Sequence, residues 1–409
     1  MGATDMSVTG DVAEMQGLYG AFSFPEKLLQ RIWATGEFVR DQLTTIDGQR
    51  VTIGQAGKWN LLGGPDFKGA RVTIGEGSER TGDVELHLRA EDWANHRHAA
   101  DPAYRNVILH VVLFPPAAGH VTRGAGGEAI PVAALLPLLH RDLESYADDA
   151  AVESLVDQPL DEALREWVGR SAEELTAMLR EHAKTRWQRK VRDANRRIER
   201  LGWSEACHHA ALEILGYRFN RVPMLRTAAR WRLAEWVRRG VDPDVAWAAE
   251  RESWSVQGVR PANHPRVRLR QYATWVRARP DWPEALISAA GRVFEGAGVE
   301  ATRTFRHKND LTARRRAWSD LVAGEAVGGT RWDNLVCDGF LPLMAARTGE
   351  DLFAPWWHWF SGDLPEGQER ALRRAGVFGG RENPAAHGPL QGLLGWRLAR
   401  EATSAGRGA

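Results

Sequence analysis

Residues 63–112 read GGPDFKGARVTIGEGSERTGDVELHLRAEDWANHRHAADPAYRNVILHVV, and this stretch decides the fold of the N-terminal part of the chain. Side chains of a β-strand return to the same face at every second residue. In a strand predicted over residues 83–88, Glu85 and His87 therefore share one face, and apolar residues occupy the other. Asp66 stands at the start of the preceding predicted strand. Acidic and imidazole side chains gathered in this way are typical of a site that holds a divalent metal against a phosphate.

Hydrophobic periodicity extends this pattern into a small α/β domain. An amphipathic helix is predicted over residues 24–43. Glycine-rich turns separate the predicted strands, which are 51–53, 70–74, 83–88 and 107–114. The order of helix, strands, short helical segment and strand predicts a mixed-sheet domain over residues 1–145.

The pattern becomes helical after residue 159. Apolar residues recur at spacings of three and four from Leu179 to Leu201, which predicts one long helix with a narrow apolar face. Further helices are predicted at 203–216, 222–239, 243–250, 266–278 and 282–296. The sequence thus predicts an α+β protein, in which a mainly helical domain over residues 146–409 follows the α/β domain.

Composition limits the class of protein. The 409 residues are 43% hydrophobic and 26% charged, as in ordinary globular proteins. Two cysteines, Cys207 and Cys337, exclude a disulfide framework and a cysteine zinc site. The longest apolar stretch is short and interrupted by prolines, and the start of the chain lacks a signal-peptide pattern. A cytoplasmic protein without membrane spans is therefore expected.

Charge is distributed unevenly along the chain. Residues 176–240 carry 16 lysines and arginines against 6 acids, a net charge of +10, whereas residues 1–150 carry a net charge of −7. A basic block suggests a surface for a polyanion such as nucleic acid, although a solvated helix face has the same composition. The candidate nucleic-acid-binding residues are Arg186, Arg189, Lys190, Arg196 and Arg197.

Two carboxylates and an imidazole form the candidate catalytic site. Asp66 and Glu85 are the expected ligands of Mg²⁺ or Mn²⁺. His87 is expected to position the attacking water or to act as a base near neutral pH. A metal in this place can activate water and stabilise charge on phosphoryl oxygens.

This arrangement resembles the PD-(D/E)XK phosphodiesterase superfamily. The core of that superfamily runs helix, strand, strand, strand, helix, strand, with an aspartate at the second strand and Glu-X-Lys on the third. Pro65-Asp66 and Glu85-Leu86-His87 match these motifs, and His87 replaces the usual lysine. The resemblance implies a metal-dependent nuclease that cleaves DNA or RNA.

A second resemblance covers more of the chain. Stretches such as GKWNLLGGPDFKGARV, LGYRFNRVP, RPANHPRVRL and NLVCDGFLPLMAA are similar to the bacterial domain-of-unknown-function 2851 family. That family shares the Glu-X-His variant, and its members are uncharacterised. It therefore supports the motif without assigning a reaction.

Histidines near the candidate site offer an alternative chemistry. Histidine-rich sites suit zinc or manganese, so a zinc-type hydrolase is a further hypothesis. A non-catalytic nucleic-acid-binding or interaction protein on a nuclease fold is another. The residues expected to support the site are Glu26, Asp83, Asp92, His96, His98 and His110.

Overall fold

The computed structural model describes residues 12–17, 20–60, 63–140, 143, 146–147, 164–251, 253–256, 259, 261–290, 294–296, 298–324, 326–362 and 366–405. The chain forms two compact units, Met1–Ala150 and Ala151–Ala409. Residue 145, where the sequence predicts the domain boundary, lies outside the described residues. No helix among the described residues is long and apolar enough to cross a membrane.

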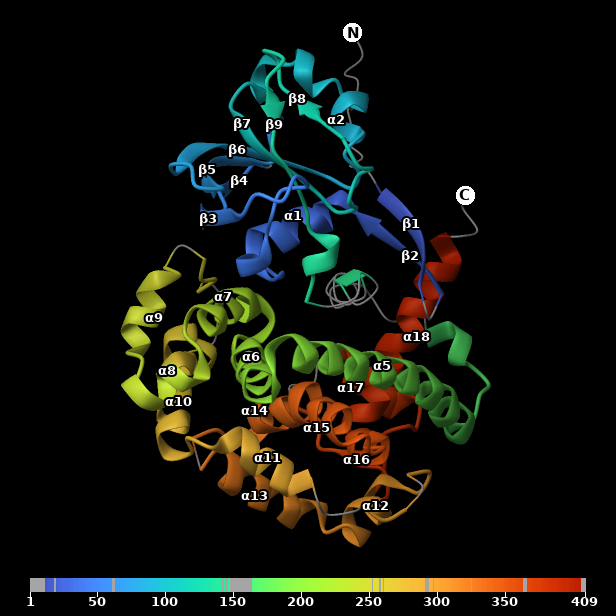
Figure 1. The fold of residues 1–409 in the computed structure, drawn as a ribbon. Helices are drawn as coiled ribbons and strands as arrows, with labels where there is room; N and C mark the ends of the chain where they lie inside the picture. The colour runs from blue at the N-terminus through green and yellow to red at the C-terminus, as the bar shows by residue number, and fades with distance from the viewer. Residues whose placement is uncertain are drawn as a thin grey trace. The chain divides into compact units, whose positions relative to one another are not determined.

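A mixed β-sheet forms the centre of the N-terminal unit (Figure 1). Strand β7 runs parallel to β6 and β10, whereas β5 runs antiparallel to β6, β3 and the short strand β4. Along the sheet the strands lie in the order β10 (Val132–Ala134), β7 (Val107–Val112), β6 (Arg80–His87), β5 (Phe67–Ile74) and β3 (Val51–Gln55), with β4 (Lys58–Trp59) beside β5.

Helix α1 (Glu26–Thr35) covers the apolar face of this sheet. Four of its side chains are buried at helical spacing, and they belong to the same core as the apolar residues of β6 and β7. The predicted helix over residues 24–43 is wrong in length. It ends at Thr35 because Gly36 takes a left-handed conformation with φ +67°, which closes the helix and sends the chain away.

Parallel strands require a crossover connection, and the one between β6 and β7 is short and irregular. It contains α2 (Asp92–Asn95) and the turns η2 (His98–Ala100) and η3 (Pro102–Tyr104). The remaining elements of the unit are β1 (Val12–Gly17), β2 (Gly20–Pro25), η1 (Arg40–Gln42), β8 (Thr122–Arg123), β9 (Ala129–Ile130) and η4 (Leu136–Leu138).

The second unit is helical. Its elements are η5 (Arg165–Trp167), α5 (Ala172–Leu201), α6 (Trp203–Leu215), α7 (Tyr217–Arg230), α8 (Leu233–Arg239), α9 (Pro243–Ala249), η6 (Pro261–Asn263), α10 (Pro265–Ala278), α11 (Trp282–Ala290), α12 (Thr302–Lys308), α13 (Leu311–Val322), α14 (Gly329–Asn334), the π-helix η7 (Leu335–Phe340), α15 (Leu341–Thr348), α16 (Phe353–His358), α17 (Glu366–Arg374) and α18 (His387–Ala405).

The long helix α5 packs against α15 and α18 (Figure 1). Ser171 and Glu174 form a capping box at its first turn, so the sequence itself defines where this helix starts. The single helix predicted over residues 222–239 is wrong, because the extended backbone of Trp231 separates α7 from α8. Most of the largest fully buried side chains of the unit are tryptophans, so these residues fill much of its core.

Candidate metal centre

Strand register builds a polar row on one face of the sheet. Glu85 of β6 pairs with His110 of β7, and Phe67 of β5 pairs with Val84 of β6. Because neighbours along a strand alternate between faces, Asp66 falls on the face of Glu85. The alternate residues of these strands belong to the core that α1 covers.

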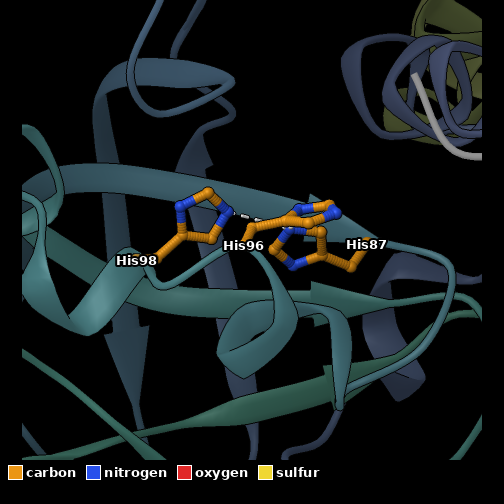
Figure 2. A group of neighbouring side chains, drawn as sticks. All are labelled: His87, His96 and His98. Atoms are coloured by element: carbon orange, nitrogen blue, oxygen red, sulfur yellow. Dashed lines mark hydrogen bonds between the residues drawn. The ribbon is translucent and has the colours of Figure 1, made fainter. Parts of the chain in front are cut away.

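Three imidazoles meet beside this row (Figure 2). His87 comes from the end of β6, whereas His96 and His98 come from the crossover connection. The Nε2 atom of His87 lies 3.2 Å from Nδ1 of His96 and 3.1 Å from Nε2 of His98. One nitrogen from each ring lies within 4.8 Å of the other two. The three lone pairs can therefore point at a common centre.

The spacing of these donors fits a divalent metal ion. Tetrahedral coordination with bonds of about 2.0–2.1 Å separates neighbouring nitrogen ligands by roughly 3.3 Å. A proton can bridge only two of the three nitrogens, whereas a cation can bind all three. The Oε1 atom of Glu85 lies 3.3 Å from Nε2 of His98 and 3.6 Å from Nε2 of His87, so it supplies a fourth donor at similar spacing.

A hydrogen-bonded chain holds the far side of the His87 ring. Its Nδ1 atom lies 2.9 Å from Nε2 of His110, and Nδ1 of His110 lies 3.0 Å from Oγ1 of Thr122. The Thr122 hydroxyl also lies 3.2 Å from Nε2 of His120. If His87 donates its Nδ1 proton to His110, then His110 donates to Thr122, and Nε2 of His87 keeps its lone pair. Partners of this kind orient histidine ligands in metal sites.

Asp66 is fixed by hydrogen bonds between the helix and the sheet. Its Oδ1 atom accepts from Nε2 of Gln30 at 2.6 Å, and its Oδ2 atom accepts from the backbone amide of Leu86 at 3.0 Å. The backbone amide of Asp66 in turn donates to Oε2 of Glu85 at 2.9 Å. Asp66 and Glu85 thus lie together as predicted, with the second oxygen of Glu85 directed at the histidines.

Burial controls the protonation of the cluster. It lowers the pKa of His87 to about 2, of His98 to about 4 and of His110 to about 3, and the neighbouring histidines add to each of these shifts. Burial also raises the pKa of the Asp66 and Glu85 carboxyls, and the charge of Asp66 raises that of Glu85 further. The imidazoles of His87, His98 and His110 are therefore neutral, and neutral imidazole is the form that binds metals.

Aromatic side chains enclose one side of the cluster. The His98 ring stacks on Tyr104 with 3.8 Å between centroids. Trp93 packs against His98 and His110 at 5.3 and 5.2 Å. His96, in contrast, is exposed. The centre is thus shielded on most sides and reachable from solvent near His96.

The residues predicted to support the site lie in different places in the structure. His96 and His98 belong to the cluster itself, and His110 contacts His87. Glu26 lies next to the network, with its Oε1 atom 3.4 Å from Nε2 of Gln30. Asp83 and Asp92 serve the local backbone instead, accepting from the amides of Gly69 at 3.1 Å and Arg89 at 2.9 Å.

The predicted site residues did not include Gln30, Trp93, Tyr104, His120 and Thr122, which all contribute to the centre. Gln30 stands one turn after Glu26 on the predicted amphipathic helix, and this spacing was a usable signal. Thr122 lies in a two-residue strand whose sequence gives no comparable signal.

Side chains of the basic block have partners within the protein. Lys190 pairs with Asp338 at 2.9 Å, Arg197 pairs with Glu213 at 2.7 Å, and Arg186 donates to Gln391 at 2.9 Å. Arg189 and Arg196 are partly buried and also interact internally. The charge of +10 therefore overstates what this block can offer a polyanion, and its binding of nucleic acid stays a prediction.

Fold and site together define a mixed α/β unit with a buried cluster of histidines and carboxyl groups, joined to a helical unit. A family model described as "Protein of unknown function (DUF2851)" matches residues 26–240, and the chain belongs to this family. This match confirms the resemblance seen in the sequence. No curated protein and no solved structure matches the chain. The resemblance to PD-(D/E)XK enzymes accordingly stays an interpretation.

Proposed function

We propose that the N-terminal unit is a metal-dependent phosphodiesterase of the nuclease type. The observation that carries the proposal is the convergence of His87, His96 and His98 on one point, with Glu85 at 3.3 Å from His98 and 3.6 Å from His87. In this proposal all four side chains hold the metal, whereas the sequence alone assigned it to Asp66 and Glu85.

The donor set favours zinc or manganese over magnesium. Imidazole nitrogens suit the transition metals, whereas magnesium prefers oxygen ligands and retained water. Such a metal supplies a Lewis acid and a water activated for attack on phosphorus. The exposure of His96 supports a catalytic role, since water can reach the centre there and could bind as a fifth ligand beside the four side chains.

Asp66 acts in this proposal through Glu85. Its backbone amide holds one oxygen of Glu85, which leaves the other oxygen for the metal. The phosphodiester is proposed as substrate because Asp66, Glu85 and His87 follow the order and strand context of the superfamily that the sequence resembles. DNA and RNA both contain this bond.

Metal analysis and cleavage assays on the full-length protein test the proposal. We expect about one equivalent of Zn²⁺ or Mn²⁺ per chain, and cleavage of labelled DNA or RNA oligonucleotides that EDTA abolishes. His96→Ala and His98→Ala should lose both the metal and the activity. The exposed His307 provides a matched control, and His307→Ala should retain both.

Two results would count against the proposal. Retention of the metal in the double variant His96→Ala/His98→Ala would place the metal elsewhere. A loaded wild-type protein that cleaves neither nucleic acid would show that the centre is not a nuclease site.

A further inference from the structure

Two lysines face each other on the antiparallel strands β4 and β5. Lys58 pairs directly with Lys68, and both side chains are exposed. Directly opposite side chains have Cβ atoms about 4.5–5.5 Å apart, and like charges at such positions destabilise a sheet. An anion bound outside the strand pair would offset this repulsion.

Register places this lysine pair on the same face as the candidate metal centre. Phe67 pairs with Val84, so its neighbours Asp66 and Lys68 fall on the face that carries Glu85. The sheet is irregular just after Lys68, where Gly69 has φ +67°. Bulges of this kind are common next to active sites, where they redirect a side chain.

The nearby carboxylates do not neutralise the pair. Asp83 lies across from the irregularity, but its Oδ1 atom accepts from the backbone amide of Gly69. Asp66 accepts from Gln30 and Leu86. Within the part of the chain that the structure describes, neither Lys58 nor Lys68 forms an ion pair.

Residue usage makes the pair more unusual. The chain uses lysine at only 6 of its 54 basic positions, and two of the six form this cross-strand pair. An ammonium group is a compact point charge, which can turn toward a phosphate oxygen without the fixed geometry of a guanidinium.

We propose that Lys58 and Lys68 bind backbone phosphates of a nucleic acid and direct it to the metal centre. Both ammonium groups can reach one phosphate or two successive ones, and their exposure suits an extended chain lying on the sheet. The inference rests on the proposed nuclease function, and it moves the main phosphate contacts from the basic helix α5 to the N-terminal unit.

The test compares two double charge reversals in the full-length protein. Lys58→Glu/Lys68→Glu removes the pair, and Lys27→Glu/Lys308→Glu makes the same change in net charge at two other exposed lysines. Binding of a fluorescent single-stranded oligonucleotide is measured by anisotropy in EDTA, between about 50 and about 200 mM salt. Working without metal separates binding from cleavage, so failure of the nuclease assay leaves this test intact.

For the pair variant we expect binding at least about tenfold weaker at low salt. The slope of log affinity against log salt should fall by about 1.4, as the loss of two phosphate contacts predicts for a single strand. The control variant should keep the wild-type slope, and metal content should not change in either. Lys58→Met/Lys68→Met, which adds no negative charge, should lose the same slope.

Equal losses in the pair variant and the control would overturn the proposal, because they would indicate general electrostatics. Wild-type binding by Lys58→Met/Lys68→Met would also overturn it. A third contrary result would come from competition with pyrophosphate. If the pair variant still binds the oligonucleotide as the wild type does, but pyrophosphate no longer displaces it, the lysines bind a small phosphorylated ligand instead.

Discussion

The proposed role of His87 uses both nitrogens of its ring. Its Nε2 atom faces the two histidines of the crossover connection, and its Nδ1 atom faces His110. Alternation along β6 predicted that Glu85 and His87 share a face. The number of histidines nearby placed His96 and His98 among the supporting residues. It could not show that both rings face Nε2 of His87, because a connection has no periodicity from which its direction can be inferred.

Thr122→Val tests the hydrogen-bonded chain behind His87. The change keeps the shape of the side chain but removes the hydroxyl that lies 3.0 Å from Nδ1 of His110. We expect metal affinity to fall about 10-fold or more, as for other residues that orient histidine ligands. Competition with a chromophoric chelator measures this loss. Thr122→Ser, which keeps the hydroxyl, should bind metal almost as wild type does; equal losses in both variants would indicate a packing effect.

At the scale of elements, strands were easier to predict than their partners. The sequence patterns located β5, β6 and β7 to within a few residues. Polar and apolar residues alternate along β6, whereas β7 is a short, almost entirely apolar run that is buried on both faces. The pairing of β4 with β5 could not be predicted, because β4 is only two residues long. The predicted helix was longer than α1, because the apolar spacing continues beyond Gly36 although the helical backbone ends at Thr35.

Lys58→Glu should stabilise the protein while it weakens nucleic-acid binding. The substitution replaces a like-charge pair across β4 and β5 with an opposite-charge pair, which is worth roughly 0.2–1 kcal/mol. Urea unfolding of the wild type and the variant at low salt measures the difference. A variant that is less stable than wild type would show that Lys58 has a structural partner.

The whole molecule consists of two compact units, Met1–Ala150 and Ala151–Ala409. The prediction of an α/β region followed by helices rests on the change of period from two to about four along the chain. The many short helices beyond residue 300 were not predicted, because their tryptophans are buried on several sides and leave no clear apolar stripe.

Metal should stabilise only the N-terminal unit, because its proposed ligands all lie there. A metal at about 100 times its dissociation constant adds roughly 2.7 kcal/mol to the free energy of unfolding. Calorimetry with Zn²⁺ and then with EDTA should therefore move one unfolding transition and leave the other in place. A joint shift of both transitions would contradict independent units.

Acid should weaken the helical unit through its buried histidines. Burial lowers the pKa of His208 to about 4, so the unfolded chain takes up this proton first as the pH falls below about 6.5. Stability from this group is complete above pH 6.5 and falls toward pH 4, by up to about 1.4 kcal/mol per pH unit. His208 contacts the Tyr272 hydroxyl and the Trp231 carbonyl, and His208→Gln can keep both contacts without titrating. Urea unfolding between pH 7 and pH 5 should show a flatter dependence for this variant; identical slopes would contradict the assignment.

The crossover connection between β6 and β7 supplies two of the four proposed ligands. Metal binding should therefore affect how easily this segment is cut by proteases. Without zinc, this segment is held by the packing of Trp93 and Tyr104 and by the hydrogen bond from Trp93 to the carbonyl of Arg123. A bound ion would add bonds that tie it to β6 through His96 and His98. Arg97 lies between these two histidines, is exposed and has φ +59°. Trypsin can therefore cleave the peptide bond that follows it. Limited proteolysis should cut after Arg97 faster in EDTA than in Zn²⁺, and an equal rate in both would contradict the tether. Metal supply would then set the lifetime of the polypeptide as well as its activity.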